Sequence, residues 1–205
     1  MAVRLRLAGA LVLTALSVAL TGAAVPANAN TTTAPTPPAA SITAQADPPS
    51  GWVTTTDPVS GISVMLPGQP TVKNTTTTDA NGETLPLRQY LLEFDGGNRA
   101  VLFQVIDATF RQVDFDKALQ GAASAQSDGT VTDGTVTNSR HFVLDGRPAA
   151  DGRITATVAG TPAVYLVRLV ADNGYLVGII TLGKATEEDA LMSFHQQVLG
   201  TLRLI

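Results

Sequence analysis

The chain has 205 residues, 13 Lys and Arg against 17 Asp and Glu, and a formal net charge of −4. This acidic balance argues against a nucleic-acid partner, because phosphates are bound by clustered Lys and Arg. The sequence contains no cysteine, which excludes disulfides and leaves the apolar core to hold the folded part together.

The first 29 residues predict a secretory signal peptide. Arg4 and Arg6 precede an apolar run from Leu7 to Leu20, and the small-residue cleavage site Ala27-Asn28-Ala29 follows. A spanning helix needs about 20 apolar residues, and this run is shorter. We expect cleavage near Ala29, no transmembrane segment in the mature chain, and a secreted, extracellular or cell-envelope location. Without a lipid-accepting cysteine, release is expected instead of lipid anchoring.

Residues 30–50 are rich in Thr, Pro and Ala and predict a flexible linker. The same composition suits an O-glycosylated stalk as well as an unmodified spacer. Residues 51–205 then predict a single domain of ordinary size.

The first strands of this domain are predicted from alternation of apolar residues. Ile62, Val64 and Leu66 share one face of a strand, which Pro67-Gly68 ends. The polar, β-branched run Thr71–Thr77 is expected to return beside this first strand as a solvated sheet edge.

A hairpin is predicted over Leu85–Phe94 and Arg99–Ala108, joined by Asp95-Gly96-Gly97-Asn98. The second of these runs is apolar on both faces, so layers are expected above and below it. Val101, Phe103 and Val105 would point to one side, and Leu102 and Ile106 to the other.

A helix and three further strands follow in the sequence. Asp114 is expected to cap an amphipathic helix that runs to about Ser127. Strands are then predicted at Thr130–Thr137, Arg140–Leu144 and Ala149–Val158, with a bend at Asp145-Gly146.

The last elements are a second hairpin and a second helix. Asn173-Gly174, a dipeptide favoured in type I′ turns, joins Pro162–Ala171 to Tyr175–Leu182. Thr186 is expected to cap the closing helix, with Gly200 as its C′ residue. Its buried stripe would contain Leu191, Phe194 and Val198, and the acids Glu187, Glu188 and Asp189 would complement the helix dipole.

This order of elements predicts an α+β fold with a largely antiparallel β-sheet. Because the central strands are apolar on both sides, we expect helices on both faces. A second copy of the chain covering one face is the alternative.

Candidate catalytic, cofactor-binding and metal-binding residues are all predicted to be none. His141 and His195 lack a second His or Cys at ligand spacing and are expected at the surface or at a helix cap. The sequence GIITLGKA from Gly178 to Ala185 approaches a phosphate-binding loop, but Ala185 lacks the required hydroxyl and Ile179–Leu182 has the pattern of a strand. The sequence also contains no G-x-S-x-G nucleophile elbow.

Four segments carry a resemblance to a known family. They are Trp52 with GISVMLPGQP at residues 61–70, the Gly146–Ala149 turn, RLVADNGYLVGII at residues 168–180, and ALMSFHQQVLGTLRL at residues 190–204. Together they resemble secreted actinobacterial proteins of the LpqN/LpqT type, which are placed with the Mog1/PsbP-like fold. The resemblance implies an antiparallel sheet between helices and a binding or assembly role.

The first functional hypothesis is therefore a secreted, non-catalytic binding module that contacts a protein partner in the bacterial cell envelope or medium. The alternative is a carrier of an apolar envelope ligand, such as a lipid, between helix and sheet. Gly178, Ala122, Ala123 and Ala125 could leave room for such a ligand, or could equally serve close packing. A hydrolase is the third hypothesis, supported only by the hydroxyl groups and the two histidines. No cofactor is expected.

Overall fold

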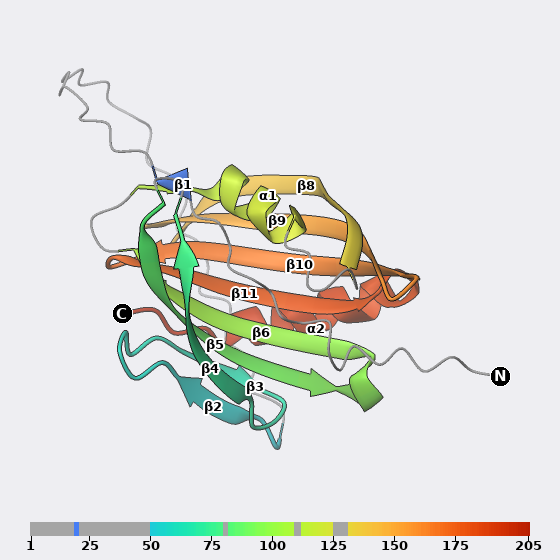
Figure 1. The fold of residues 1–205 in the computed structure, drawn as a ribbon. Coiled ribbons are helices and arrows are strands. Elements are labelled where there is room, and N and C mark those ends of the chain that lie inside the picture. The colour runs from blue at the N-terminus through green and yellow to red at the C-terminus, as the bar shows by residue number, and fades with distance from the viewer. Residues whose placement is uncertain (1–18, 21–49, 80–81, 109–111, 125–130) are drawn as a thin grey trace, which may run out of the picture.

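A seven-stranded antiparallel sheet forms the centre of the molecule (Figure 1). The computed structural model describes residues 19–20, 50–79, 82–108, 112–124 and 131–205. The strand order is β4-β5-β6-β11-β10-β9-β8. The strands are β4 (Thr71–Thr78), β5 (Thr84–Phe94), β6 (Arg99–Asp107), β8 (Val131–Leu144), β9 (Arg147–Val158), β10 (Thr161–Asp172) and β11 (Tyr175–Lys184).

Each face of this sheet carries one helix, as Figure 1 shows. Helix α1 (Phe115–Ser124) packs on β8 and β9 and defines the α1 face. Helix α2 (Glu188–Gly200) packs on β10 and β11, beside a hairpin of β2 (Val53–Thr56) and β3 (Ser63–Leu66), and together they define the α2 face. The predicted α+β class, with an antiparallel sheet between helices, is confirmed.

Most of the predicted signal peptide and linker lies outside the described residues. Of residues 1–49, the structure describes only β1 (Ala19–Leu20), which pairs with β7 (Val113–Asp114) immediately before α1. The cleavage site and the linker therefore remain predictions from sequence.

The predicted hairpins are confirmed, and their turns show why. Asn173 and Gly174 have φ values of 45° and 84°, so both central residues have the positive φ that a type I′ turn requires. The β5–β6 hairpin turns through a short 3₁₀ helix, Asp95–Gly97, in which Gly96 and Gly97 also have positive φ. Gly is suited to these positions because it has no Cβ to clash.

Both sides of the central strands are buried, as the sequence predicts. Val101, Phe103 and Val105 pack into a cluster on the α2 face, whereas Leu102 and Ile106 join the cluster on the α1 face. Both faces of β6 are therefore buried from Ala100 to Ile106, and its alternating side chains supply both halves of the core.

Helix α1 approaches the sheet closely at a glycine. A Cβ atom on Gly152 would lie 2.4 Å from Leu119 Cδ2, so the helix packs where β9 has no side chain. The space beside Gly178, by contrast, is filled by Gln104, whose Cγ lies 2.9 Å from the position of a Cβ. The room for an apolar ligand that the sequence suggested at Gly178 is therefore occupied, and Ala125 lies outside the described residues.

The cap predicted for α1 is confirmed. Asp114 Oδ1 accepts a hydrogen bond of 3.1 Å from the backbone N–H of Lys117. This bond and the charge of Lys117 lower the pKa of Asp114. The helix is described to Ser124, so its predicted extension to Ser127 falls in residues that are not described.

The predicted pairing of the first strands is wrong. β3 pairs with β2, a strand that the sequence did not indicate, and β4 pairs with β5 at the edge of the main sheet. Ile62, Val64 and Leu66 are fully buried on the α2 face, whereas β4 is mostly exposed. The segment from Pro67 to Pro70 therefore carries the chain from one layer to another and forms no hairpin.

The two strands predicted at 130–137 and 140–144 are a single strand, β8, of 14 residues. Its pairing with β9 shifts register between Thr132 and Thr135 and again between Val136 and Asn138. Asp133 has a φ of 58° at the first irregularity. Such bulges interrupt the alternation of side chains, which explains why the sequence pattern suggested two separate strands.

The ends of α2 also differ from the prediction. A 3₁₀ turn, Ala185–Glu187, precedes the helix, and neither Thr186 nor another side chain caps it by a hydrogen bond. Gly200 is the last helical residue, and Thr201 at the C-cap keeps a right-handed conformation with φ −96°. Of the predicted stripe, Leu191 and Val198 are fully buried and Phe194 is half-buried.

Candidate functional site

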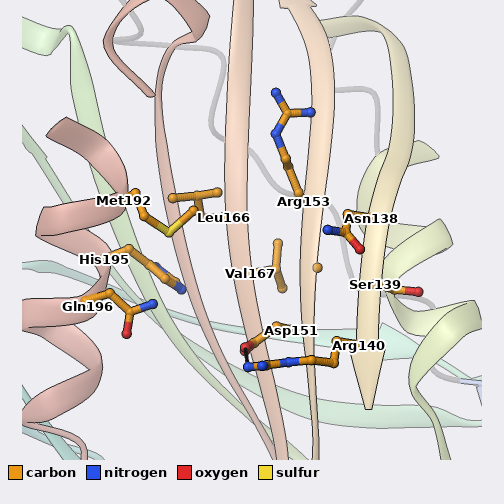
Figure 2. A pocket seen from close by; sticks show the side chains of 11 residues that line it. Asn138, Ser139, Arg140, Asp151, Arg153, Leu166, Val167, Met192, His195 and Gln196 are labelled. Carbon is orange, nitrogen blue, oxygen red and sulfur yellow. Dashed lines mark hydrogen bonds and ion pairs between the residues drawn. The ribbon is translucent and has the colours of Figure 1, made fainter. Parts of the chain in front are cut away.

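An open groove of about 360 Å³ lies on the α2 face, between α2 and strands β8–β10 (Figure 2). Met192, His195 and Gln196 of α2 form one wall. Residues of β8, β9 and β10 form the floor and the opposite wall. The groove exists because α2 covers β10 and β11 and leaves the outer strands of this face open.

Strand register arranges the polar floor of the groove. Arg140 on β8 lies opposite Asp151 on β9, and Asp151 lies opposite Arg168 on β10. Two residues further along β9, and on the same face, Arg153 lies between Asn138 and Leu166. Side chains that are opposite each other in neighbouring strands lie about 5 Å apart. Neighbouring side chains within each of these two rows are therefore close enough to interact.

Asp151 is the centre of the first row. Arg168 donates to both of its oxygens, from Nε at 2.6 Å and from Nη2 at 2.8 Å, and Arg140 Nη2 donates at 3.0 Å. Burial by itself would raise the pKa of Asp151, but the hydrogen bonds and charges of Arg168 and Arg140 outweigh it and lower the pKa. Asp151 is therefore a carboxylate at neutral pH, held by two arginines.

Arg153 ties the second row to the helix. It donates to Glu188 from Nε at 2.6 Å and from Nη2 at 2.7 Å, and its Nη1 lies 2.7 Å from Thr137 Oγ1. The hydrogen bond from Arg153 lowers the pKa of Glu188. This two-pronged pair links β9 to the first turn of α2 and so fixes the helix relative to the groove.

His195 is buried, which corrects the prediction of a surface or cap histidine. Its side chain is in the stripe that α2 turns to the sheet, four residues after Leu191 and three before Val198. Its Nδ1 lies 3.1 Å from the Oγ1 of the buried residue Thr181. Burial, reinforced by the charge of Arg168, lowers the pKa of His195 to about 4, so the ring is neutral at pH 7.

His141 is at the surface, as predicted. Its Nε2 lies 3.0 Å from Asp116 Oδ1, and both side chains are largely exposed. This pair joins β8 to α1 on the other side of the sheet from the groove.

The acids at the start of α2 do more than complement its dipole. Glu188 pairs with Arg153, and Glu187 accepts a hydrogen bond of 2.9 Å from Arg99 Nη2. Arginines from β6 and β9 therefore bind both residues, in addition to the dipole role that the sequence predicts. The segment GIITLGKA at residues 178–185, which approaches a phosphate-binding loop in sequence, is strand up to Lys184, where β11 ends. The prediction of a strand at Ile179–Leu182 is confirmed.

The groove is lined by a histidine, an acid and a serine, His195, Asp151 and Ser139, but the three do not form a catalytic chain. Ser139 lies opposite Gly152, whose Cβ position faces Leu119 of α1, and Figure 2 shows its hydroxyl directed away from Asp151 and His195. Asp151 is bonded to arginines and His195 to Thr181. Thr181, the partner of His195, is on β11, and Ser139 is on β8, three strands away. At the usual strand spacing these two residues are about 14 Å apart. Within the described residues, no group of three or more His, Cys, Asp or Glu is placed to hold a metal ion.

The sequence did not reveal the groove residues Arg140, Asp151 and Arg153, or Arg168, which bonds to Asp151. A signal was present, since each of β8, β9 and β10 carries an arginine within an apolar or β-branched run. That signal could be interpreted only with the register, because shifting a strand by one residue moves a side chain to the opposite face.

Among the known proteins with which it was compared, this chain is similar only to solved structures. No protein-family model matches the chain, and no curated protein matches it. The solution structure of cyanobacterial PsbP (CyanoP) from Synechocystis sp. PCC 6803 is similar with a TM-score of 0.47 and 12% identity, covering 78% of this chain and 96% of that one. Protein PA94 of unknown function from Pseudomonas aeruginosa has a TM-score of 0.43 and 10% identity, covering 75% and 97%.

The LpqN/LpqT assignment made from the sequence stays a prediction. In the part of the chain that is described, no helix is both long enough and apolar enough to cross a membrane.

Proposed function

We propose that this chain is an exported, non-catalytic binding module of the bacterial cell envelope or medium, of the LpqN/LpqT type, and that it contacts a protein partner through the groove beside α2. Export is supported by the charged, apolar and Ala-x-Ala pattern of residues 1–29. The binding role is supported by the chemistry of the groove.

One observation carries the binding role: the charged groups on the groove floor are fixed by one another. Asp151 is held by Arg168 and Arg140, and Arg153 by Glu188. Catalysis by proton transfer needs a base within hydrogen-bond reach of the group that it activates. Here the histidine is a weak base, because its pKa is lowered to about 4, and its Nδ1 lies 3.1 Å from the hydroxyl oxygen of the buried residue Thr181. Fixed charges beside an open cavity give a bound ligand defined polar partners and so fix its orientation.

The experiment compares partner capture by the wild-type protein and two charge variants. Met192→Glu places a carboxylate on the helical wall of the groove, where Met192 is 39% exposed. Val72→Glu is the matched control, because Val72 is also exposed but lies on β4, at the opposite edge of the sheet. Cross-linked partners from the host envelope would be identified by mass spectrometry for each protein.

We expect a specific partner that the wild type and Val72→Glu capture equally and that Met192→Glu loses. Equal capture by all three proteins would reject the groove as the contact surface. Turnover of ester, peptide or glycosidic substrates that disappears in His195→Gln would reject the non-catalytic role.

A further inference from the structure

We propose that the groove recognises a peptide segment that places a carboxylate at Arg140 and a neighbouring apolar side chain against Met192. This inference rests on the proposed function and names the chemistry of the partner. It is carried by the charge of the groove, by the open guanidinium of Arg140, and by the residues around it.

The charged residues of the groove give it a positive balance in an acidic protein. Two arginines, Arg140 and Arg153, line the groove with one acid, Asp151. The charges of their bonded partners Arg168 and Glu188 offset each other, while the whole chain has a net charge of −4. His195 adds no charge at neutral pH, because its pKa is about 4. An incoming anion is therefore attracted to the groove and repelled by much of the remaining surface.

The three arginines differ in how far their donors are already used. Arg168 is 13% exposed and gives two hydrogen bonds to Asp151, and Arg153 is bonded to both Glu188 and Thr137. Arg140 is 70% exposed and gives one hydrogen bond to Asp151. Of these three, Arg140 thus keeps most of its five N–H groups for a carboxylate.

The position of the Arg140 guanidinium is fixed before a ligand arrives. Its Cζ lies 5.2 Å from the centre of the Phe142 ring, and Arg168 lies 4.9 Å from the same ring. Cation–π contact and the bond to Asp151 together restrain the side chain. A restrained donor loses less conformational entropy on binding than a free surface arginine would.

Two amides face the groove from opposite walls. Figure 2 shows Asn138 on β8 and Gln196 on α2, with their amide groups directed toward the space between them. Each can donate to a carboxylate or pair with a peptide backbone. The open space between these walls is about 360 Å³, and it is here that the peptide segment would lie.

An apolar contact lies next to this polar set. Met192 extends from α2 toward Leu166 and lines the same groove (Figure 2). Methionine is flexible and polarizable, so it adapts to apolar side chains of different shape. Met192 on α2 and Arg140 on β8 lie on opposite sides of the groove, and successive side chains of an extended chain point to opposite sides. The proposed segment therefore has an acidic residue next to an aliphatic residue.

The test uses two short peptides with blocked ends that differ in one group. Both contain Leu followed by Glu or by Gln, between Gly and Ser residues. Binding to the full-length protein would be followed by NMR through the Met192 methyl group and the side-chain amides of Asn138 and Gln196. We expect the Glu peptide to bind about fivefold more tightly than the Gln peptide, which corresponds to a charge-assisted hydrogen bond of about 1 kcal/mol.

Arg140→Gln should reduce this fivefold preference to nearly one, whereas Lys73→Gln should leave it unchanged. Lys73 is an exposed cation of β4, at the far edge of the sheet, so the control removes the same charge elsewhere. Equal binding of the two peptides, or equal effects of the two variants, would overturn the proposal. Butyrate that binds as tightly as the Glu peptide would also overturn it in favour of a small-acid site.

The outcomes separate this inference from the proposed function. If Met192→Glu loses its protein partner but the Glu peptide has no preference, the binding role stands and the acidic recognition fails. If the peptide preference depends on Arg140 but Met192→Glu captures partners normally, the acidic recognition stands and the groove is not the main contact for those partners.

Discussion

Asp57 and Asp151 both accept hydrogen bonds from arginines on the α2 face of the sheet, but Asp57 is buried and Asp151 lies in an open groove. Asp57 is fully buried in the loop after β2, and its Oδ1 accepts from Arg88 Nε at 2.6 Å and from the Tyr90 hydroxyl at 2.8 Å. Its Oδ2 accepts from the backbone N–H and hydroxyl of Ser60. Asp151 instead lies on the floor of an open groove.

The difference shows how burial changes the role of the same ion pair. Burial by itself would raise the pKa of Asp57, but the bonds from Arg88, Ser60 and Tyr90 outweigh it and lower the pKa. The cluster joins the β2–β3 hairpin to β5, which is one reason that this hairpin lies on the main sheet. At Asp151 one of the two arginines, Arg140, remains accessible to solvent, so its charge can also be recognised by a partner.

The largest effect is expected from Asp57→Ala. It leaves the charge of Arg88 buried, and Arg88 Nη2 already has no hydrogen-bond partner among the described residues. Removing one member of a buried pair costs about 3–5 kcal/mol. Urea denaturation would measure the loss, with Asp116→Ala as a control that breaks the exposed pair with His141. Similar losses in both variants would contradict the structural role of Asp57.

The next effect concerns pH. Below the ordinary pKa of about 6.5, the unfolded chain takes up a proton at His195 that the folded protein does not accept until about pH 4. Stability should therefore fall as the pH decreases from 6.5 to 4, by on the order of 3 kcal/mol from this group. Denaturation of His195→Gln across the same range should give a shallower slope. Parallel slopes would show that His195 titrates normally.

A smaller effect is expected from Asp151→Asn. The amide keeps some hydrogen bonds but removes the charge between Arg140 and Arg168, so a stability loss of about 1–2 kcal/mol is expected. The groove gains one unit of positive charge at the same time. The Glu peptide should therefore bind this variant more tightly than the wild type, a result that titration can check. Weaker binding would mean that Asp151 contributes through positioning Arg140.

The smallest stability effect is expected from Arg140→Gln. Its side chain is exposed and its pair with Asp151 faces solvent, so the loss should stay below about 1 kcal/mol. Thermal denaturation measures this value. A loss approaching that of Asp57→Ala would show that Arg140 is a structural residue, and the peptide experiment would then need Arg140→Lys as its variant.

Much of the fold follows from local patterns. The β5–β6 and β10–β11 hairpins were predicted because their turn residues accept positive φ. Burial on both faces of β6 was predicted because apolar residues occupy successive positions. The β2–β3 pairing was missed, since the polar sequence of β2, VTTT, has little apolar alternation. His195 was misplaced because one polar residue in a helical stripe does not show which way it faces.

The sequence by itself determined the number of layers, the main hairpins and the approximate positions of both helices, because these depend on φ preferences and on the periods of apolar residues. Only the tertiary structure decided the groove. Arg140, Asp151 and Arg168 are up to 28 positions apart in the chain, and strand register alone places them in one row. Helix α2 packs over β10 and β11 and is fixed there by the bond between Arg153 and Glu188. This packing leaves Arg140 and Asp151 in a groove that is open to solvent.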